Sequence, residues 1–185
     1  MTADELADAL REHALLEGDF VLRSGRRSRY YLDKYRFATR PELLRPLGER
    51  LAEEVRTAEP DATLLAAPEL GAVALAAAAS LVSNLPFVIV RREAKTYGTG
   101  NRIEGVFSAG ERAALIEDVV TSGGAALDAI EALREAGLEC RTAVCVVDRE
   151  EGGVDALARR AVRLRPLFRA GELLERQKTA GNPHG

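Results

Sequence analysis

The apolar positions of the chain include four short, continuous runs that do not alternate with polar residues. Such runs, rich in β-branched residues, are typical of strands buried on both faces of a parallel sheet. The predicted strands are residues 63–67, 87–91, 113–118 and 142–148. These runs favour a central, mostly parallel sheet.

Helical periodicity occupies the stretches before and between these runs. The predicted helices are residues 4–12, 41–57, 71–83 and 125–136. In the last of them Ala126, Ile130 and Leu133 share one face, and Gly137 follows as a stop signal. Strands that alternate with helices indicate an α/β fold in which helices flank the sheet.

Residues 92–111 form the one long segment without a periodic pattern. A loop of about twenty residues inside a compact domain is usually a functional lid. We therefore predict a flexible loop there, within a single domain that spans residues 1–185, because no linker or internal repeat divides the chain.

Composition narrows the classes of function. The formal net charge of -3 gives no general attraction to nucleic acid or to anionic membranes. The longest apolar stretch, residues 70–82, is too short to span a bilayer, and the first residues do not resemble a signal peptide. Cys140 and Cys145 lack further partners for a metal site, so we expect buried, reduced thiols and a cytoplasmic protein.

Residues 114–125 carry the most specific chemical signal. A predicted strand passes through Glu117 and Asp118 into a turn that contains Thr121, Ser122, Gly123 and Gly124 and opens a helix at Ala125. Glycines let consecutive N–H groups approach an anion, and the helix start adds its positive dipole end. The two carboxylates at the carboxyl end of a strand are placed to accept hydrogen bonds from sugar hydroxyls. A ribose 5-phosphate suits both features.

The same segment excludes two common nucleotide sites. No lysine follows the glycines, as a P-loop requires, and the spacing is not that of a GxGxxG fingerprint. Nucleoside triphosphate hydrolysis and dinucleotide binding are therefore disfavoured.

The string resembles the motif of type I phosphoribosyltransferases that binds phosphoribosyl pyrophosphate (PRPP). The resemblance implies that Glu117 and Asp118 hold the ribose hydroxyls, and that Mg²⁺ arrives with PRPP, without a metal site of the protein's own. It implies that the 5-phosphate is wrapped by Val119, Val120, Thr121, Ser122, Gly123, Gly124 and Ala125. It also implies that pyrophosphate meets the turn Glu69, Leu70 and Gly71, a sequence that by itself indicates only an ordinary strand-to-helix turn.

The predicted loop begins with a cluster of cations. Arg91, Arg92 and Lys95 precede several glycines, and lysine is scarce, because of 26 basic residues only Lys34, Lys95 and Lys178 are lysines. A cation delivered by a closing loop stabilises the charge that develops on departing pyrophosphate. Lys95 is the first candidate for this catalytic role, with Arg91 and Arg92 beside it.

This loop resembles the catalytic loop of orotate phosphoribosyltransferases. The resemblance implies a homodimer in which each loop reaches the neighbouring subunit's site. The chain departs from many members at Arg92, Tyr97 and Thr99, where lysine, histidine and an acid are common. A tyrosine does not titrate near neutral pH as histidine does, so we expect this loop to act through the charges of its cations and not through proton transfer at Tyr97.

The base pocket is predicted from residues 22–34 and from the end of the fourth strand. A planar, anionic base such as orotate needs an aromatic wall and a cation with paired donors. The resemblance, which covers about residues 19–153, implies that Arg23, Tyr30, Tyr31 and Arg149 frame orotate and that Thr121 touches it. It assigns no role to Lys34.

The expected architecture is a type I phosphoribosyltransferase-like fold. It comprises a small hood of about residues 1–40 plus the C-terminal segment, a core of about residues 41–150 and a flexible loop of about residues 92–111. The expected reaction transfers the phosphoribosyl group from PRPP to orotate, giving orotidine 5′-monophosphate and pyrophosphate. Two alternatives stay open at this point: transfer to another base, and a non-catalytic regulator that senses PRPP.

Overall fold

The computed structural model describes residues 1–21, 25, 27–93 and 101–180, the last five without their side chains. At its centre these residues form a six-stranded sheet in the order β5-β4-β3-β6-β7-β8. Neighbouring strands run parallel except β4 and β5, which are antiparallel. The strands are β3 (Leu64–Pro68), β4 (Phe87–Val90), β5 (Ile103–Glu104), β6 (Arg112–Val120), β7 (Glu139–Asp148) and β8 (Arg163–Arg169).

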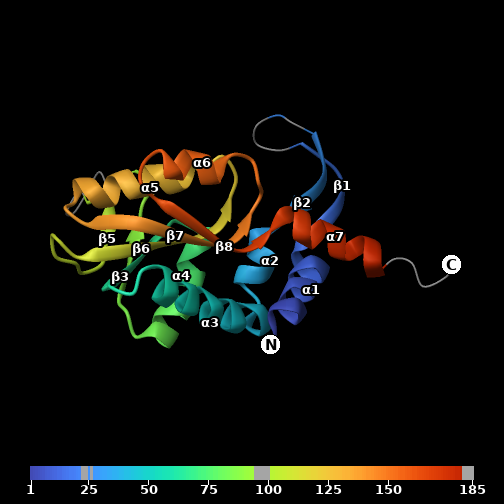
Figure 1. The fold of residues 1–185 in the computed structure, drawn as a ribbon, viewed down its shortest axis with the longest axis horizontal. Helices are drawn as coiled ribbons and strands as arrows, with labels where there is room; N and C mark the ends of the chain where they lie inside the picture. The colour runs from blue at the N-terminus through green and yellow to red at the C-terminus, as the bar shows by residue number, and fades with distance from the viewer. Residues whose placement is uncertain (22–24, 26, 94–100, 181–185) are drawn as a thin grey trace.

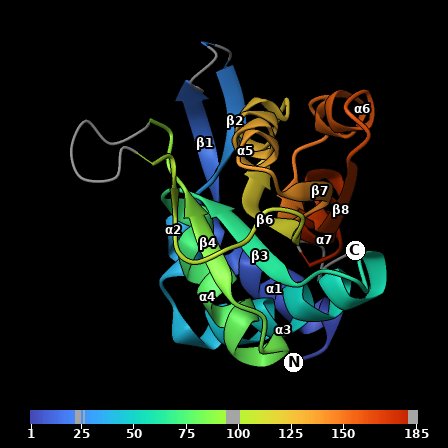
Figure 2. The same ribbon diagram turned by 90° about the vertical axis from the view of Figure 1, so that its left-hand side faces the viewer.

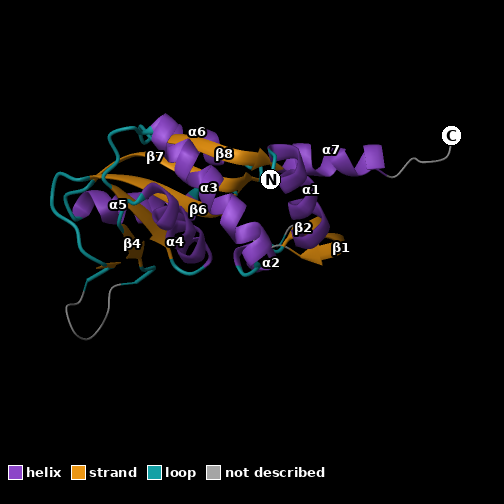
Figure 3. Cartoon of the chain, turned by 90° about the horizontal axis from the view of Figure 1, so that it is seen from below, coloured by secondary structure: helices purple, strands orange, loops and turns teal. Residues whose placement is uncertain are grey.

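Helices cover both faces of this sheet (Figure 1). One face is covered by α3 (Pro41–Ala58) and α4 (Gly71–Ser83), which lie side by side in Figure 3, and the other by α5 (Gly124–Glu135) and α6 (Gly153–Ala158). Side chains alternate along each strand, so Leu65 and Ile116 belong to the core under α3 and α4, whereas Leu64 and Leu115 belong to the core under α5. Burial on both faces explains why these strands read as continuous apolar runs.

A smaller lobe lies beyond the carboxyl ends of the sheet strands (Figure 1). It contains α1 (Ala3–Ala14), the antiparallel pair β1 (Leu15–Val21) and β2 (Arg27–Leu32), α2 (Lys34–Ala38) and α7 (Ala170–Ala180). The side chain of Thr2 accepts from the N–H of Glu5, and Glu5 accepts in return, which caps the start of α1. The hairpin extends away from α3 and α4 (Figure 2).

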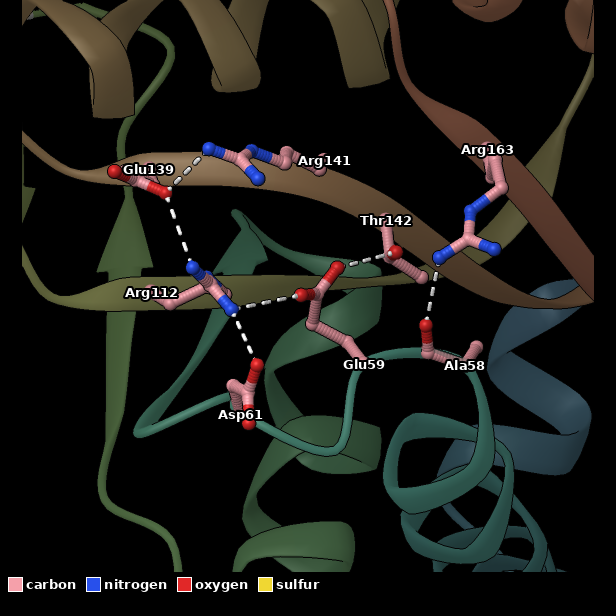
Figure 4. Close-up of polar contacts among 8 residues, drawn as sticks. All are labelled: Ala58, Glu59, Asp61, Arg112, Glu139, Arg141, Thr142 and Arg163. Carbon is pink, nitrogen blue, oxygen red and sulfur yellow. Dashed lines mark hydrogen bonds and ion pairs between the residues drawn. The ribbon is translucent and has the colours of Figure 1, made fainter.

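A network of polar side chains, of which Glu59 and Thr142 are buried, joins the amino ends of the central strands (Figure 4). Glu59, just after α3, accepts a hydrogen bond of 2.8 Å from the Thr142 hydroxyl and lies 3.7 Å from a guanidinium nitrogen of Arg112. Arg112 also pairs with Asp61 at 2.8 Å and with Glu139 at 3.5 Å. The carboxylates at this edge of the sheet therefore face a guanidinium group.

The predicted α/β architecture with a mostly parallel sheet is confirmed, and each of the four predicted strands and four predicted helices has its counterpart. Two details differ. Helix α5 begins at Gly124, one residue before the predicted start, and Ile103 and Glu104 of the predicted loop pair with β4. Among the described residues, no helix has the length and apolar content that a membrane crossing requires.

Candidate functional site

The turn between β6 and α5 forms an open cradle. Gly123 is the N-cap of α5 with a φ of 84°, a left-handed conformation that favours glycine. Thr121, Ser122, Gly124 and Ala125 are exposed around it. The first N–H groups of a helix have no acceptor within the helix, and no side chain of the described residues caps this one. The cradle therefore has exposed hydroxyls and uncapped N–H groups, as the sequence predicts, and the binding of an anion by them stays a prediction.

Close packing from α6 supports the cradle from behind. A Cβ added to Gly123 would lie 2.7 Å from Leu157 Cδ1, and one added to Gly153 would lie 2.5 Å from Val120 Cγ1. Gly123 has the positive φ given above, and a Cβ on Gly153 would also lie 2.7 Å from the backbone oxygen of Thr121, so both positions favour glycine. Sequence reasoning did not identify Gly153, whose only sequence signal is the pair of glycines after Glu151.

Glu117 and Asp118 lie on β6 as predicted, and both are buried, with 6% and 3% of their surface exposed. Burial is the main cause that raises the pKa of Glu117 to about 8, and the neighbouring charge of Asp118 is the second. Asp118 Oδ1 accepts a hydrogen bond of 2.6 Å from the N–H of Val119. Two adjacent buried carboxyl groups at the carboxyl end of a strand are costly, which is typical of a site that binds a ligand.

Among the described residues, Lys34 is the cation that pairs with one of these carboxylates. Its Nζ lies 2.8 Å from Asp118 Oδ2, although 84 positions separate the two in the sequence. Burial lowers the pKa of Lys34, but the hydrogen bond and charge of Asp118 outweigh that effect, so the pKa lies above its ordinary value. Gly71 makes room for the pair, because a Cβ there would lie 1.8 Å from Asp118 Oδ2.

The predicted pyrophosphate turn follows β3 directly. Glu69 and Leu70 are joined by a cis peptide bond, and Glu69 Oε1 accepts a hydrogen bond of 2.9 Å from the N–H of Arg92. Two cavities flank the turn. One of about 300 Å³ is lined by Pro68, Glu69, Val90, Arg91, Arg92, Gly124, Ala125, Asp128 and Ala129. The other, of about 400 Å³, is lined by Lys34, Tyr35, Glu69, Leu70, Arg91, Arg92 and Glu93.

The predicted catalytic cations are placed only in part. Arg91 and Arg92 line both cavities beside the turn. Arg91 also lies 4.0 Å from Glu104 Oε1, across the β4–β5 pair. Lys95, the first candidate, lies outside the described residues.

The end of β7 meets the smaller lobe at Arg149. Its guanidinium carbon lies 5.1 Å from the ring centroid of Tyr30, and its side chain is 9% exposed. One guanidinium nitrogen lies 3.2 Å from Glu151, while Nε is buried without a hydrogen-bond partner among the described residues. A buried guanidinium with an unused N–H suits a planar anionic ligand.

The structure separates the two hood tyrosines. Tyr30 faces Arg149, whereas Tyr31 packs against Phe20 with ring centroids 5.6 Å apart. Successive side chains of a strand point to opposite faces, so only Tyr30 of this pair lies beside Arg149. Arg23 lies outside the described residues, and Thr121 stands exposed in the cradle.

The described residues contain no group of three or more His, Cys, Asp or Glu side chains arranged to hold a metal ion. The donor chemistry of the site nevertheless fits Mg²⁺, which prefers oxygen ligands and often binds through one or two carboxylates plus the phosphates of a substrate. Glu117, Asp118 and Glu69 supply such oxygens around the cradle and the turn.

Comparisons with known proteins agree with this geometry. No model of a protein family matches the chain. The orotate phosphoribosyltransferase of Methanocella arvoryzae is 48% identical over 172 residues, which cover 92% of this chain and 96% of that protein. A crystal structure of orotate phosphoribosyltransferase from Aeropyrum pernix superposes with a TM-score of 0.81 at 31% identity, covering 94% and 99% of the two chains.

A third similar protein connects the fold to the substrate. The crystal structure of Mycobacterium tuberculosis orotate phosphoribosyltransferase in complex with PRPP superposes with a TM-score of 0.77 at 29% identity, covering 92% of this chain and 98% of that one. The cradle, the carboxylate pair and nearly full-length similarity to these enzymes lead to one conclusion. The chain belongs to the orotate phosphoribosyltransferase family.

Proposed function

We propose that the cradle, the carboxylate pair and the Glu69–Leu70 turn together bind PRPP for phosphoribosyl transfer to orotate. Members of this family are pentosyltransferases of pyrimidine biosynthesis, and the chain transfers the 5-phosphoribosyl group to orotate, forming orotidine 5′-monophosphate and pyrophosphate. The observation that carries the proposal is the buried Glu117–Asp118 pair directly before an uncapped helix start.

In this proposal each part of PRPP has its own protein partner. The 5-phosphate accepts from the N–H groups and hydroxyls of residues 119–125, and the ribose hydroxyls donate to Glu117 and Asp118. The pyrophosphate group lies against Glu69, Leu70 and Gly71, beside the cavities that Arg91 and Arg92 line. Orotate stacks on Tyr30 and accepts hydrogen bonds from the guanidinium group of Arg149, and Thr121 contacts the edge of the orotate ring.

The protein's chemical contribution is electrostatic and positional. Negative charge grows on the leaving pyrophosphate, so Arg91, Arg92 and Lys95 stabilise the transition state more than the ground state. Alignment of the orotate nitrogen with the anomeric carbon lowers the barrier further. Bound Mg²⁺ supplies additional charge neutralisation at the pyrophosphate.

We propose that the enzyme is a homodimer whose 92–111 loops complete the neighbouring subunits' sites. The support is the apolar character of α4, where Leu81 is 89% and Val82 is 53% exposed in the single chain.

The lobe of α1, β1, β2, α2 and α7 is proposed to be the hood over the core of residues 41–150. We also place the protein in the cytoplasm, because both cysteines are buried and unpaired, as a reducing compartment favours.

The first test follows orotate absorbance with PRPP and Mg²⁺ present, with adenine, hypoxanthine and uracil assayed in parallel. We expect consumption of orotate alone, and a loss of at least about 100-fold in kcat for Lys95→Ala, because one charged contact made in the transition state is removed. PRPP binding without turnover of any base would contradict the assignment.

A mixing experiment tests the shared loop. Lys95→Ala and Asp118→Asn subunits are each expected to be nearly inactive, but a hybrid dimer contains one site with neither substitution. Random exchange should therefore restore about a quarter of wild-type activity. Activity that stays at the level of the separate variants after verified subunit exchange would show that each loop serves its own subunit.

A further inference from the structure

Lys34 occupies a position for which the family resemblance gave no role. It is the first residue of α2, and the Asp33 side chain accepts from the N–H of Tyr35 to cap that helix. The cap fixes the backbone from which the Lys34 side chain reaches Asp118. Lys34 thus connects the hood to the carboxylate pair of the core.

The ammonium group lies at a boundary between two binding regions. On one side is Asp118 Oδ2 at 2.8 Å, which we assign to the ribose. On the other is the cavity of about 400 Å³ that Lys34 lines together with Arg91, Arg92 and Glu69. Both regions are within the reach of one flexible lysine side chain.

The exposures of the two partners differ greatly. The side chain of Asp118 is 4% exposed and that of Lys34 is 37% exposed. Asp118 is further fixed by the N–H of Val119 and by the close approach of Gly71. The aspartate therefore has one position, whereas the lysine, half-buried on a long stem, can rotate towards the cavity.

Charge gives a reason for such a movement. With Lys34 paired to Asp118, a carboxylate oxygen needed by the ribose hydroxyls is occupied. A diphosphate in the cavity offers the ammonium group a stronger acceptor than a single carboxylate, and the hydroxyls then satisfy Asp118. When Lys34 exchanges Asp118 for the diphosphate, its ammonium group pairs with phosphate oxygens and the Asp118 carboxylate accepts from the ribose hydroxyls. Neither charged group is then left without a hydrogen-bond partner.

Resting on the assignment of Asp118 to the ribose, we propose that Lys34 is a substrate-binding residue that changes partners. It pairs with Asp118 in the free enzyme and donates to the diphosphate group of PRPP in the complex. Lys34 would thereby release the ribose-binding carboxylate only when the diphosphate is present.

The test measures binding of three ligands by calorimetry, at one pH and ionic strength, to wild type, Lys34→Met and Lys34→Arg. The ligands are PRPP, ribose 5-phosphate and pyrophosphate, each with Mg²⁺. For Lys34→Met we expect the dissociation constants of PRPP and pyrophosphate to rise about tenfold, because one charge-assisted contact is lost. Ribose 5-phosphate should bind as well as to wild type or better, because its competitor for Asp118 is gone. Lys34→Arg should restore pyrophosphate binding.

The matched control is Arg36→Met, a cation two residues away that is 51% exposed and pairs with Asp33. It should leave all three constants within about twofold of wild type, as expected for an exposed pair. If Lys34→Met weakens ribose 5-phosphate but not pyrophosphate, Lys34 merely holds Asp118 in place and the exchange is refuted. If Lys34→Met does not fold, the neutral variant Lys34→Gln is judged by the same criteria.

Failure of the underlying assignment gives a different result. Wild-type protein that binds pyrophosphate but not ribose 5-phosphate would overturn the role of Asp118, and the proposed exchange with it. Wild-type protein that binds both, together with an unchanged pyrophosphate constant in Lys34→Met, would overturn the role of Lys34 alone.

Discussion

Buried carboxyl groups lie both at the amino ends of the sheet strands, the amino edge, and at their carboxyl ends, the carboxyl edge, but the partners of these groups differ. At the amino edge, Glu59 has the Thr142 hydroxyl and Arg112 as partners (Figure 4). At the carboxyl edge, Glu117 and Asp118 are adjacent, and the ion pair with Lys34 is made by Asp118. Burial and the neighbouring charge raise the pKa of Glu117 to about 8.

The difference separates stability from function. A buried carboxylate with two good partners ties α3 to β6 and β7 and loses little by being buried. In the buried pair of the carboxyl edge, Asp118 has the half-exposed Lys34 as its ion-pair partner, and the pair keeps room for further donors, which our proposal assigns to the ribose hydroxyls. Substitutions at the two edges should therefore affect different quantities.

The largest expected effect comes from Gly71→Ala at the carboxyl edge. The new Cβ displaces the Asp118 carboxylate, so we expect kcat/KM for PRPP to fall about 100-fold, the loss of charged hydrogen bonds worth about 3 kcal/mol. Steady-state kinetics measure this change in kcat/KM for PRPP. The control is Gly48→Ala, whose Cβ would lie 2.7 Å from Ala78 Cβ between α3 and α4 and should lower stability without changing the KM for PRPP. Equal KM values for PRPP in Gly71→Ala and Gly48→Ala would show that the carboxyl edge has no special role in binding PRPP.

Removing the acid of the amino edge should affect stability alone. Glu59→Ala leaves the buried Thr142 hydroxyl without its acceptor, while Arg112 keeps Asp61 and Glu139, and we expect the free energy of unfolding to fall by about 2 kcal/mol. Urea denaturation measures the change, with Glu53→Ala, from an exposed pair with Arg56, expected to cost less than about 0.5 kcal/mol. A raised KM for either substrate in folded Glu59→Ala would link this edge to the site.

The raised pKa of Glu117 predicts a pH-dependent gain from Glu117→Gln. The folded chain holds the Glu117 proton up to about pH 8, whereas the unfolded chain releases it near 4.5, so wild type loses stability as pH rises through that window. The melting temperature of Glu117→Gln should match wild type below pH 4.5 and exceed it increasingly towards pH 8, by about 10 °C. A constant difference at all pH values would contradict the raised pKa.

The smallest expected effect concerns the base. Lysine lacks the paired donors of arginine, so Arg149→Lys should raise the KM for orotate about tenfold and leave the KM for PRPP within about twofold. Arg165→Lys, on β8 and paired with Glu54, is the matched control. If Arg149→Lys raises both constants equally, Arg149 supports the fold of the site and not the base.

Local sequence patterns were enough to predict the sheet core and the cradle. The four buried strands are continuously apolar, and the Glu117–Ala125 string contains its acids, hydroxyls and glycines within nine consecutive residues. Strand β8 was not predicted, because arginines alternate with its apolar residues and Pro166 interrupts it. Such a pattern is tolerated in the outermost strand of a sheet, which is the position of β8.

Contacts between distant residues were beyond the reach of such patterns. Lys34 meets Asp118 only because α2 folds onto the end of β6, and Gly153 matters only because α6 packs behind the cradle. The separation of Tyr30 from Tyr31 depends on the strand geometry of β2, which the polar residues around it did not suggest. The predictions for Arg23 and Lys95 stay predictions.

The most direct test titrates PRPP with Mg²⁺ into Asp118→Asn by calorimetry and records the melting temperature of the same sample. We expect PRPP affinity to fall at least about tenfold while the melting temperature stays within about 2 °C of wild type, because this carboxylate serves the ligand and not the fold. Unchanged PRPP affinity with a markedly lower melting temperature would contradict it and make the carboxyl edge a structural counterpart of the Glu59 network.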